Sequence, residues 1–268
     1  MVIQNDSNFR DMIMGESQHK FIYGYNGAAR EQLLRALVKD FPVTLDSSEP
    51  IGIYLDSIGL PKFDVTNEGL RKDTLRTLCR EYRNFSIVTS LLDATINQVE
   101  TKALNERSIE FVDWINLAYG SDIAKRIRSI KELRDIISEG RNTYRLEYEN
   151  YIKSGEISGL VSAMPIMFIS LEMFISTYKK MINAESYIAL VVDHQTPIAI
   201  KSQQAINDLV ASRITAHLSM KVACDPEGWE TYYDLSGNTI DDSHDCGIVE
   251  IDDSNFAYTK KLMDKYQQ

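Results

Sequence analysis

Apolar residues recur along this chain in two patterns, which are short unbroken runs and longer stretches with a helical period. Unbroken runs that are rich in β-branched residues predict strands, and those with no polar interruption predict strands of a parallel sheet. The predicted strands are 21–23, 51–55, 187–192, 218–224 and 247–251. Two further segments, 231–235 and 239–240, flank Ser236-Gly237-Asn238 and predict a β-hairpin.

The helical period appears between these runs and dominates the middle of the chain. Short helices are predicted at 6–19, 30–39, 200–213 and 255–268. Residues 65–184 have little glycine and a single proline, and predict a helical insertion with helices around 121–139, 142–153 and 160–183. The expectation is an α/β fold in one domain, residues 1–268. It has a phosphate-loop-like, mostly parallel sheet, a large helical insertion and a C-terminal β-hairpin.

Composition and charge narrow the possible functions. The chain has 268 residues, of which 44% are hydrophobic and 25% charged, and this balance is typical of a globular protein with a sizeable core. Its formal net charge is −10. A generic nucleic-acid binder would present a basic face, so this charge argues against one, although a local basic patch stays open.

Cysteine spacing and hydropathy indicate the compartment. Cys79, Cys224 and Cys246 are far apart and form no C-x-x-C pair, which favours reduced thiols in a cytoplasmic protein over a zinc or redox site. No basic, apolar leader opens the chain. The most apolar stretch, 157–175, contains Pro165 and Glu172 and predicts a buried helix, so no membrane association is expected.

A glycine-containing turn follows the first predicted strand. Residues 24–31 read Gly-Tyr-Asn-Gly-Ala-Ala-Arg-Glu and align with the phosphate-loop pattern G-x-x-x-x-G-K-[ST]. Gly24 keeps the first glycine, whereas Ala29, Arg30 and Glu31 replace the glycine, lysine and hydroxyl residue. The alternative is an ordinary strand–turn–helix.

The strand at 187–192 ends on an acid, Asp193, as does the metal-binding strand of phosphate-loop hydrolases. With the loop and the later strands in this order, the chain resembles the AAA+ ATPases, and more narrowly the bacterial origin-recognition/Cdc6-like branch. The resemblance implies that a degenerate Walker A loop faces ATP or ADP with Mg²⁺. Its residues would be Gly24, Asn26, Gly27, Ala28, Ala29, Arg30 and Glu31.

The same resemblance assigns roles outside the loop. Asp193 would bind Mg²⁺, and His194 stands where the family has its catalytic Glu. Cys224 or Asp225 falls near the family's polar sensor, and Arg213 near an interface arginine. A solvated residue after a strand is the alternative for His194.

The departures from the pattern weaken nucleotide binding on physical grounds. Arg30 keeps the charge of lysine but not its shape, and Glu31 places a carboxylate beside a polyphosphate, a repulsion on the order of several kcal/mol. Bound Mg²⁺ would offset part of this repulsion. We expect Arg30 to pair with Glu31 or Asp193, so that an internal ion pair stands in for nucleotide and metal.

Three functions remain open. The first is a pseudo-ATPase, not an enzyme, that acts as a protein-interaction or regulatory subunit in a bacterial or mobile-element assembly for phage defence or DNA transactions. Its partner would be an active ATPase homologue, an effector or a second copy. The second is a slow Mg²⁺-dependent ATPase or nucleotide sensor. The third is a nucleic-acid adaptor that uses the helical insertion. Within it, the basic residues of 121–153 could form a basic strip, but the interleaved acids favour a salt-bridged, solvated helix.

Overall fold

The computed structural model describes most of the chain, and two compact units divide it. The described residues are 11–24, 27–38, 50–62, 70–96, 102–119, 127–158, 170–212, 217–225, 227–241 and 245–251. The first unit combines residues within 1–57, 185–197 and 207–268, and the second those within 58–184 and 198–206. The predicted insertion is therefore a compact unit in its own right, and it includes a segment from after the third strand.

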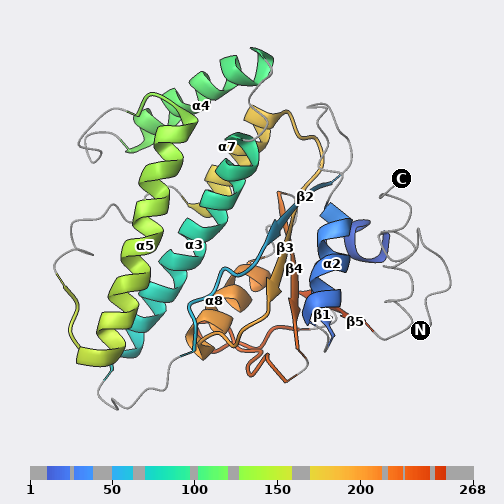
Figure 1. Cartoon of the computed structure of the whole chain (residues 1–268), viewed down its shortest axis with the longest axis vertical. Helices are drawn as coiled ribbons and strands as arrows, with labels where there is room; N and C mark the ends of the chain where they lie inside the picture. Colours follow the sequence, from blue (N-terminus) through green and yellow to red (C-terminus); the bar gives the residue numbers. More distant parts are fainter. Residues whose placement is uncertain are drawn as a thin grey trace. The chain divides into compact units, whose positions relative to one another are not determined.

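A five-stranded sheet forms the first unit, and each strand pairs with its neighbours in parallel. The strands are β1 (His19–Tyr23), β2 (Ile51–Leu55), β3 (Ile188–His194), β4 (Leu218–Cys224) and β5 (Cys246–Glu250). Their order is β2-β3-β4-β1-β5 (Figure 1). The predicted α/β class is confirmed, and the five strands pair with one another in parallel only.

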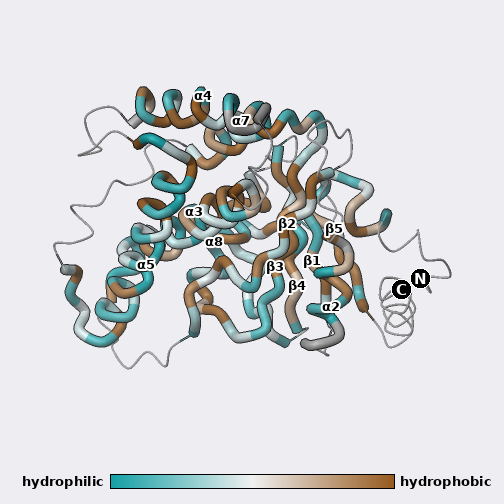
Figure 2. The backbone as a smooth tube through the Cα atoms, turned by 45° about the horizontal axis from the view of Figure 1, so that its top comes forward, coloured by the Kyte–Doolittle hydropathy of each residue, from teal (hydrophilic) through white to brown (hydrophobic). Residues whose placement is uncertain are grey.

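The inner strands are buried as their unbroken apolar runs predict. Every residue of β3 and of β4 is buried, and Figure 2 shows hydrophobic positions along these strands. On one face, α2 (Gly27–Val38) packs against the sheet through Leu33 and Leu34. Other members of this core are Ile13, Met14, Ile22, Tyr187, Ala189, Val191, Ala223, Val249 and Ile251.

The connections leave β1 and β4 in opposite directions. From β1 the chain runs through α2 to the far edge strand β2, whereas from β4 it passes over β1 to the other edge strand, β5. Right-handed crossovers place these two connections on opposite faces of the sheet. Trp229, in the second connection, packs on Phe21, with ring centroids 5.1 Å apart. The gap between the carboxyl ends of β1 and β4 is therefore a topological switch point, where open α/β sheets bind ligands.

Long helices build the second unit. They are α3 (Lys72–Ile96), α4 (Lys102–Tyr119), α5 (Ile130–Ser154), α7 (Leu171–Ile182) and the beginning of α8 (Ile200–Ala211). Phe85 of α3 packs on Tyr144 of α5, with ring centroids 5.3 Å apart. Phe111 of α4 meets Phe174 of α7 at 5.5 Å, edge to face.

One continuous helix, α5, replaces the two helices predicted at 121–139 and 142–153. Gly140 lies inside it, and a Cβ there would stand 2.6 Å from the Phe85 ring. The glycine therefore admits an aromatic ring and does not end the helix. The helix ends at Gly155, which has a φ of 74° and whose N–H bonds to the Tyr151 carbonyl.

Several other predicted boundaries differ from the structure. The helix after the first turn begins at Gly27 and not at residue 30. The predicted hairpin is reduced to one antiparallel bridge, Tyr233–Thr239, around a turn in which Gly237 has a φ of 92°. Within 6–19, residues 11–14 are helical and β1 begins at His19, while 6–10 and the predicted helix 255–268 lie outside the described residues.

The described helices were also examined for a membrane span. None of those in the described ranges is both long and apolar enough to cross a bilayer.

Candidate functional site

A buried arginine stands at the switch point. Along β3 the alternation of side chains puts Ala189, Val191 and Asp193 on the face that α2 covers, because period 2 directs every second residue to the same side. Arg30, in the first turn of α2, meets Asp193 there: its Nε donates to Oδ1 at 2.9 Å. Neither side chain is exposed at all.

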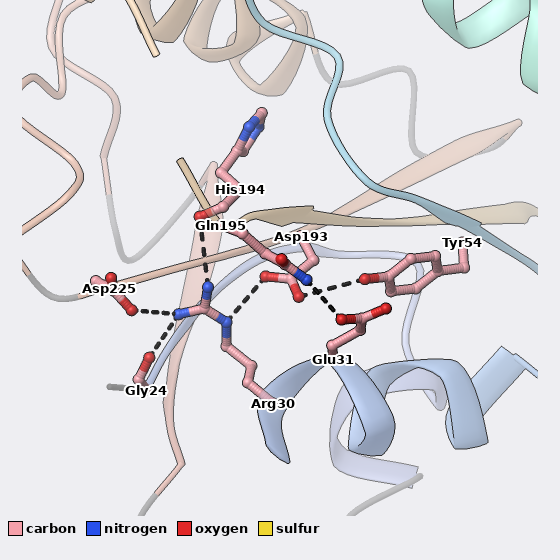
Figure 3. A network of polar contacts seen from close by, with 8 residues as sticks. All are labelled: Gly24, Arg30, Glu31, Tyr54, Asp193, His194, Gln195 and Asp225. Carbon is pink, nitrogen blue, oxygen red and sulfur yellow. Dashed lines mark hydrogen bonds and ion pairs between the residues drawn. The ribbon is translucent and has the colours of Figure 1, made fainter. Parts of the chain in front are cut away.

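The other donors of Arg30 connect the ends of three strands. Its Nη1 donates to the Gly24 carbonyl after β1 and to Oδ1 of Asp225 after β4, the latter at 2.8 Å. Its Nη2 donates to the His194 carbonyl at 3.4 Å. Figure 3 shows the guanidinium at the centre of these groups. The carboxyl ends of β1, β3 and β4 are thus tied together through one side chain.

Asp193 is held by more than the arginine. Its Oδ2 accepts a hydrogen bond from the Tyr54 hydroxyl of β2 at 3.3 Å. Burial raises the pKa of Asp193, and the charge and hydrogen bonds of Arg30, with further hydrogen bonds from Gln195 and Tyr54, oppose this rise. Both carboxylate oxygens therefore have hydrogen-bond partners within the protein.

Glu31 belongs to a separate, more exposed group. It accepts hydrogen bonds from Arg35 at 2.7 Å and from the Gln195 amide at 2.8 Å. These partners lower the pKa of Glu31, Arg35 first. The predicted pairing of Arg30 with Asp193 is therefore confirmed, and the alternative pairing with Glu31 is wrong.

The His194 side chain lies on the opposite face of the sheet. Its ring points away from the guanidinium in Figure 3, and only its carbonyl reaches Arg30. The Nδ1 atom is 3.0 Å from the Ser57 hydroxyl, and the ring centroid is 5.9 Å from that of Trp229. Burial, and then the charge of Arg30, lower the pKa of His194 to about 3. The His194 side chain is therefore a buried, neutral imidazole. It is not solvated, and it lies on the other face of the sheet from the Asp193 carboxylate.

Of the two residues near the predicted sensor position, Asp225 contacts Arg30 and Cys224 does not. Cys224 lies one residue earlier on β4, so its side chain falls on the opposite face, where burial raises its pKa to about 12. Asp225 contacts the guanidinium with a side chain that is 47% exposed. Arg213 and Asn26 lie outside the described residues, as do the side chains of Ala28 and Ala29.

Sequence reasoning missed Tyr54 and Gln195. Tyr54 interrupts the apolar strand Ile51–Leu55 on the face that α2 covers, and its ring also lies 4.0 Å from the Arg35 guanidinium carbon. The available signal was a tyrosine, with its polar hydroxyl, inside a short apolar strand that is followed in sequence by an acidic residue. Gln195 carried no comparable signal, because it follows β3 as one of several polar residues.

The cluster does not fit Mg²⁺-nucleotide as it stands. The donors that a phosphate would need on Arg30 are given to carboxylates and carbonyls, and two acids, Asp193 and Asp225, contact this one cation. Because α2 begins at Gly27, only two residues separate it from Gly24, and most of the predicted loop is helix. Among the described residues, no group of three His, Cys, Asp or Glu is arranged to hold a metal ion.

No family model matches the chain, and neither a curated protein nor a solved structure matches it.

Proposed function

We propose that this protein is a pseudo-ATPase: an α/β subunit with a degenerate phosphate loop that does not turn over nucleotide and acts by binding other proteins. The observation that carries the proposal is the buried Arg30–Asp193 ion pair at the switch point. By resemblance alone, the setting is a cytoplasmic bacterial or mobile-element assembly for phage defence or DNA transactions. Cys79 and Cys224 are buried and form no disulfide, which agrees with a reducing compartment.

Magnitudes favour the ion pair over a nucleotide. Removing one partner of a buried ion pair costs about 3–5 kcal/mol, because the other charge is left uncompensated. A dissociation constant of about 1 mM corresponds to about 4 kcal/mol. If a phosphate had to displace Asp193 from Arg30 without replacing its interactions, a site of intrinsically micromolar affinity would bind only at millimolar concentration.

The location of the ion pair favours one of two interpretations. It supports a former binding site whose ligand the ion pair replaced, over an ion pair that only stabilises the core. Arg30 contacts residues at the carboxyl ends of β1, β3 and β4, on both sides of the switch point. Open α/β sheets bind ligands at such a position. Arg30 therefore occupies with protein atoms the place where a ligand is expected, and it stabilises the architecture without one.

Thermal unfolding with millimolar Mg-ATP tests the proposal. We expect no stabilisation of the wild type, whereas a ligand at about 100 times its dissociation constant adds about 2.7 kcal/mol. The matched variant combines Ala29→Gly, Arg30→Lys and Glu31→Ser, which restores the working pattern and frees Asp193 for Mg²⁺. We expect this variant to gain a saturable shift. A saturable shift of the wild type contradicts the proposal, and no shift in a folded variant contradicts the relic phosphate loop.

The slow ATPase or nucleotide sensor remains the alternative that this experiment separates. It requires Arg30 to exchange Asp193 for phosphate while Glu31 and Asp193 hold Mg²⁺. Saturable stabilisation together with phosphate release by the wild type, lost in Asp193→Asn, would establish it.

The protein-binding half of the proposal needs its own measurement. We expect the purified protein to form a stoichiometric complex with the product of a neighbouring gene in size-exclusion chromatography with light scattering. The same measurement on the protein alone reports self-association. The interaction role would be contradicted if the protein bound no product of a neighbouring gene and was also monomeric on its own.

A further inference from the structure

Two lysines lie side by side on the sheet face that α2 covers. They are farther from the carboxyl ends of the strands than Arg30 is. Lys20 of β1 and Lys221 of β4 are register partners in the parallel ladder. Lys221 is fully buried, and Lys20 is 6% exposed. Buried ammonium groups are costly unless they are paired, so two at one place call for a specific arrangement.

The segment 11–18, which precedes β1, supplies that arrangement. The Nζ of Lys221 donates to the main-chain carbonyls of Glu16 at 2.9 Å and Gln18 at 2.7 Å. The Nζ of Lys20 donates to the Met12 carbonyl and lies 3.3 Å from the Glu16 carboxylate. Both amines therefore bond to this one segment, which covers them.

Other contacts hold the same segment. The Tyr187 hydroxyl donates to the Met14 carbonyl, and the Ser219 hydroxyl donates to the Gln18 carbonyl at 3.0 Å. Ile13 and Met14 enter the core on the α2 face of the sheet. Release of the segment would therefore expose apolar core as well as the two amines.

The charges around the lysines are unbalanced. Glu16 is the one carboxylate that the described contacts place on them, and its side chain is 68% exposed. Tyr187 presents its ring 5.9 Å from the Lys221 Nζ. Burial and then Lys20 lower the pKa of Lys221 to about 7, against a smaller opposing effect of Glu16.

We propose that Lys20 and Lys221 form a proton-sensitive latch, which holds segment 11–18 on the sheet and releases it as the pH falls. The latch is independent of the proposed pseudo-ATPase function.

The direction follows from linkage between protonation and opening. With the segment released, Lys221 regains contact with water and an ordinary pKa of 10.5, whereas in the closed state the value is about 7. The open state then binds the proton more tightly, so falling pH favours opening by up to about tenfold per pH unit from 10.5 to 7. Below 7 the contribution of Lys221 is constant, because both states then hold the proton.

Amide hydrogen exchange, corrected for the intrinsic pH dependence, tests the latch. The reporter is Gly15, whose N–H bonds to the Asp11 carbonyl at 2.7 Å. Leu133, whose N–H bonds to the Ser129 carbonyl in the other unit, is the reference. Between pH 9 and 7 we expect Gly15 protection to fall by up to about tenfold per unit, with Leu133 unchanged. Lys221→Met should remove this dependence; its persistence in the variant, or its absence from the wild type, overturns the proposal.

A titration of the wild type keeps the proposal testable if Lys221→Met does not fold. The NMR signal of the carbon next to the Lys221 amine should titrate with a midpoint near 7, and Lys20→Met should raise that midpoint. A midpoint near 10.5 in the wild type overturns the latch.

Discussion

At the scale of single residues, Arg30 shows how a charged side chain becomes part of a core. It is the largest fully buried side chain in the described part of the chain. Two carboxylates and two carbonyls accept its hydrogen bonds. A buried charge is tolerated when its donors are satisfied, and then it fixes one arrangement of the elements that it contacts.

Replacing Arg30 with Met should destabilise the protein by about 3–5 kcal/mol, because Asp193 would be left buried without its cation. Adding Asp193→Leu should restore most of this loss, since both charges are then removed. Asp225→Asn should cost about 1 kcal/mol or less, because Asp225 is half exposed. Urea unfolding at neutral pH measures all three, and a single variant Arg30→Met as stable as the wild type would show that the ion pair contributes nothing.

His194 should make the protein sensitive to acid. Its folded-state pKa of about 3 lies below the unfolded value of 6.5, so the unfolded state takes up the proton first. The free energy of unfolding should fall as the pH drops from 6.5 toward 3, by up to about 1.4 kcal/mol per unit. His194→Asn can keep a hydrogen bond to Ser57 and should have a shallower pH slope in urea unfolding. Equal slopes would mean that the imidazole titrates normally.

At the scale of elements, local signals identified helices well and their limits poorly. Ser129 caps the start of α5: its hydroxyl accepts from the Glu132 N–H, while the Glu132 carboxylate accepts from the N–H of Arg128, one residue before the cap. The Ser-x-x-Glu spacing at 129–132 is visible in the sequence and would have predicted where the helix starts. The role of Gly140 could not be predicted from the sequence, because it depends on the Phe85 ring, which approaches from another helix.

Gly140→Ala should therefore destabilise the protein despite the higher helix propensity of alanine. The propensity gain is about 1 kcal/mol, whereas overpacking against Phe85 typically costs about 1–3 kcal/mol. In the double variant Gly140→Ala/Phe85→Leu, the added methyl group should cost less stability than it does in Gly140→Ala, where the Phe85 ring is intact. A thermodynamic cycle from urea unfolding of the two single variants and the double variant checks this. Stabilisation by Gly140→Ala alone would show that the Phe85 ring moves aside freely.

At the scale of the whole molecule, the strand order creates the site. Arg30 and Asp193 are 163 residues apart in sequence, and Arg30 and Asp225 are 195 apart. They meet because β4 lies between β1 and β3, so that the carboxyl ends of all three strands adjoin. A sheet in another order would separate these residues even with the same strands.

The charge of the molecule predicts little affinity for nucleic acid. The chain carries a net charge of −10, and two described arginines of α5 are paired with acids, Arg145 with Glu149 and Arg134 with Asp93. We expect no retention of duplex or single-stranded DNA in mobility-shift assays even at low salt. Retention that weakens steeply as salt rises would instead reveal a basic surface and favour the adaptor function.

The sequence by itself determined the elements and their class, because hydrophobic periodicity acts over a few residues. It also determined that Arg30 has two acidic candidates, Glu31 and Asp193. Only the tertiary structure decided between them, since the choice depends on which strand ends adjoin and which face each side chain takes. The same non-local packing decided the partners of Lys20 and Lys221, and it placed Asp193 on the α2 face of the sheet and His194 on the opposite face. Burial then shifted the pKa values of Lys221, Asp193 and His194, which no local pattern records.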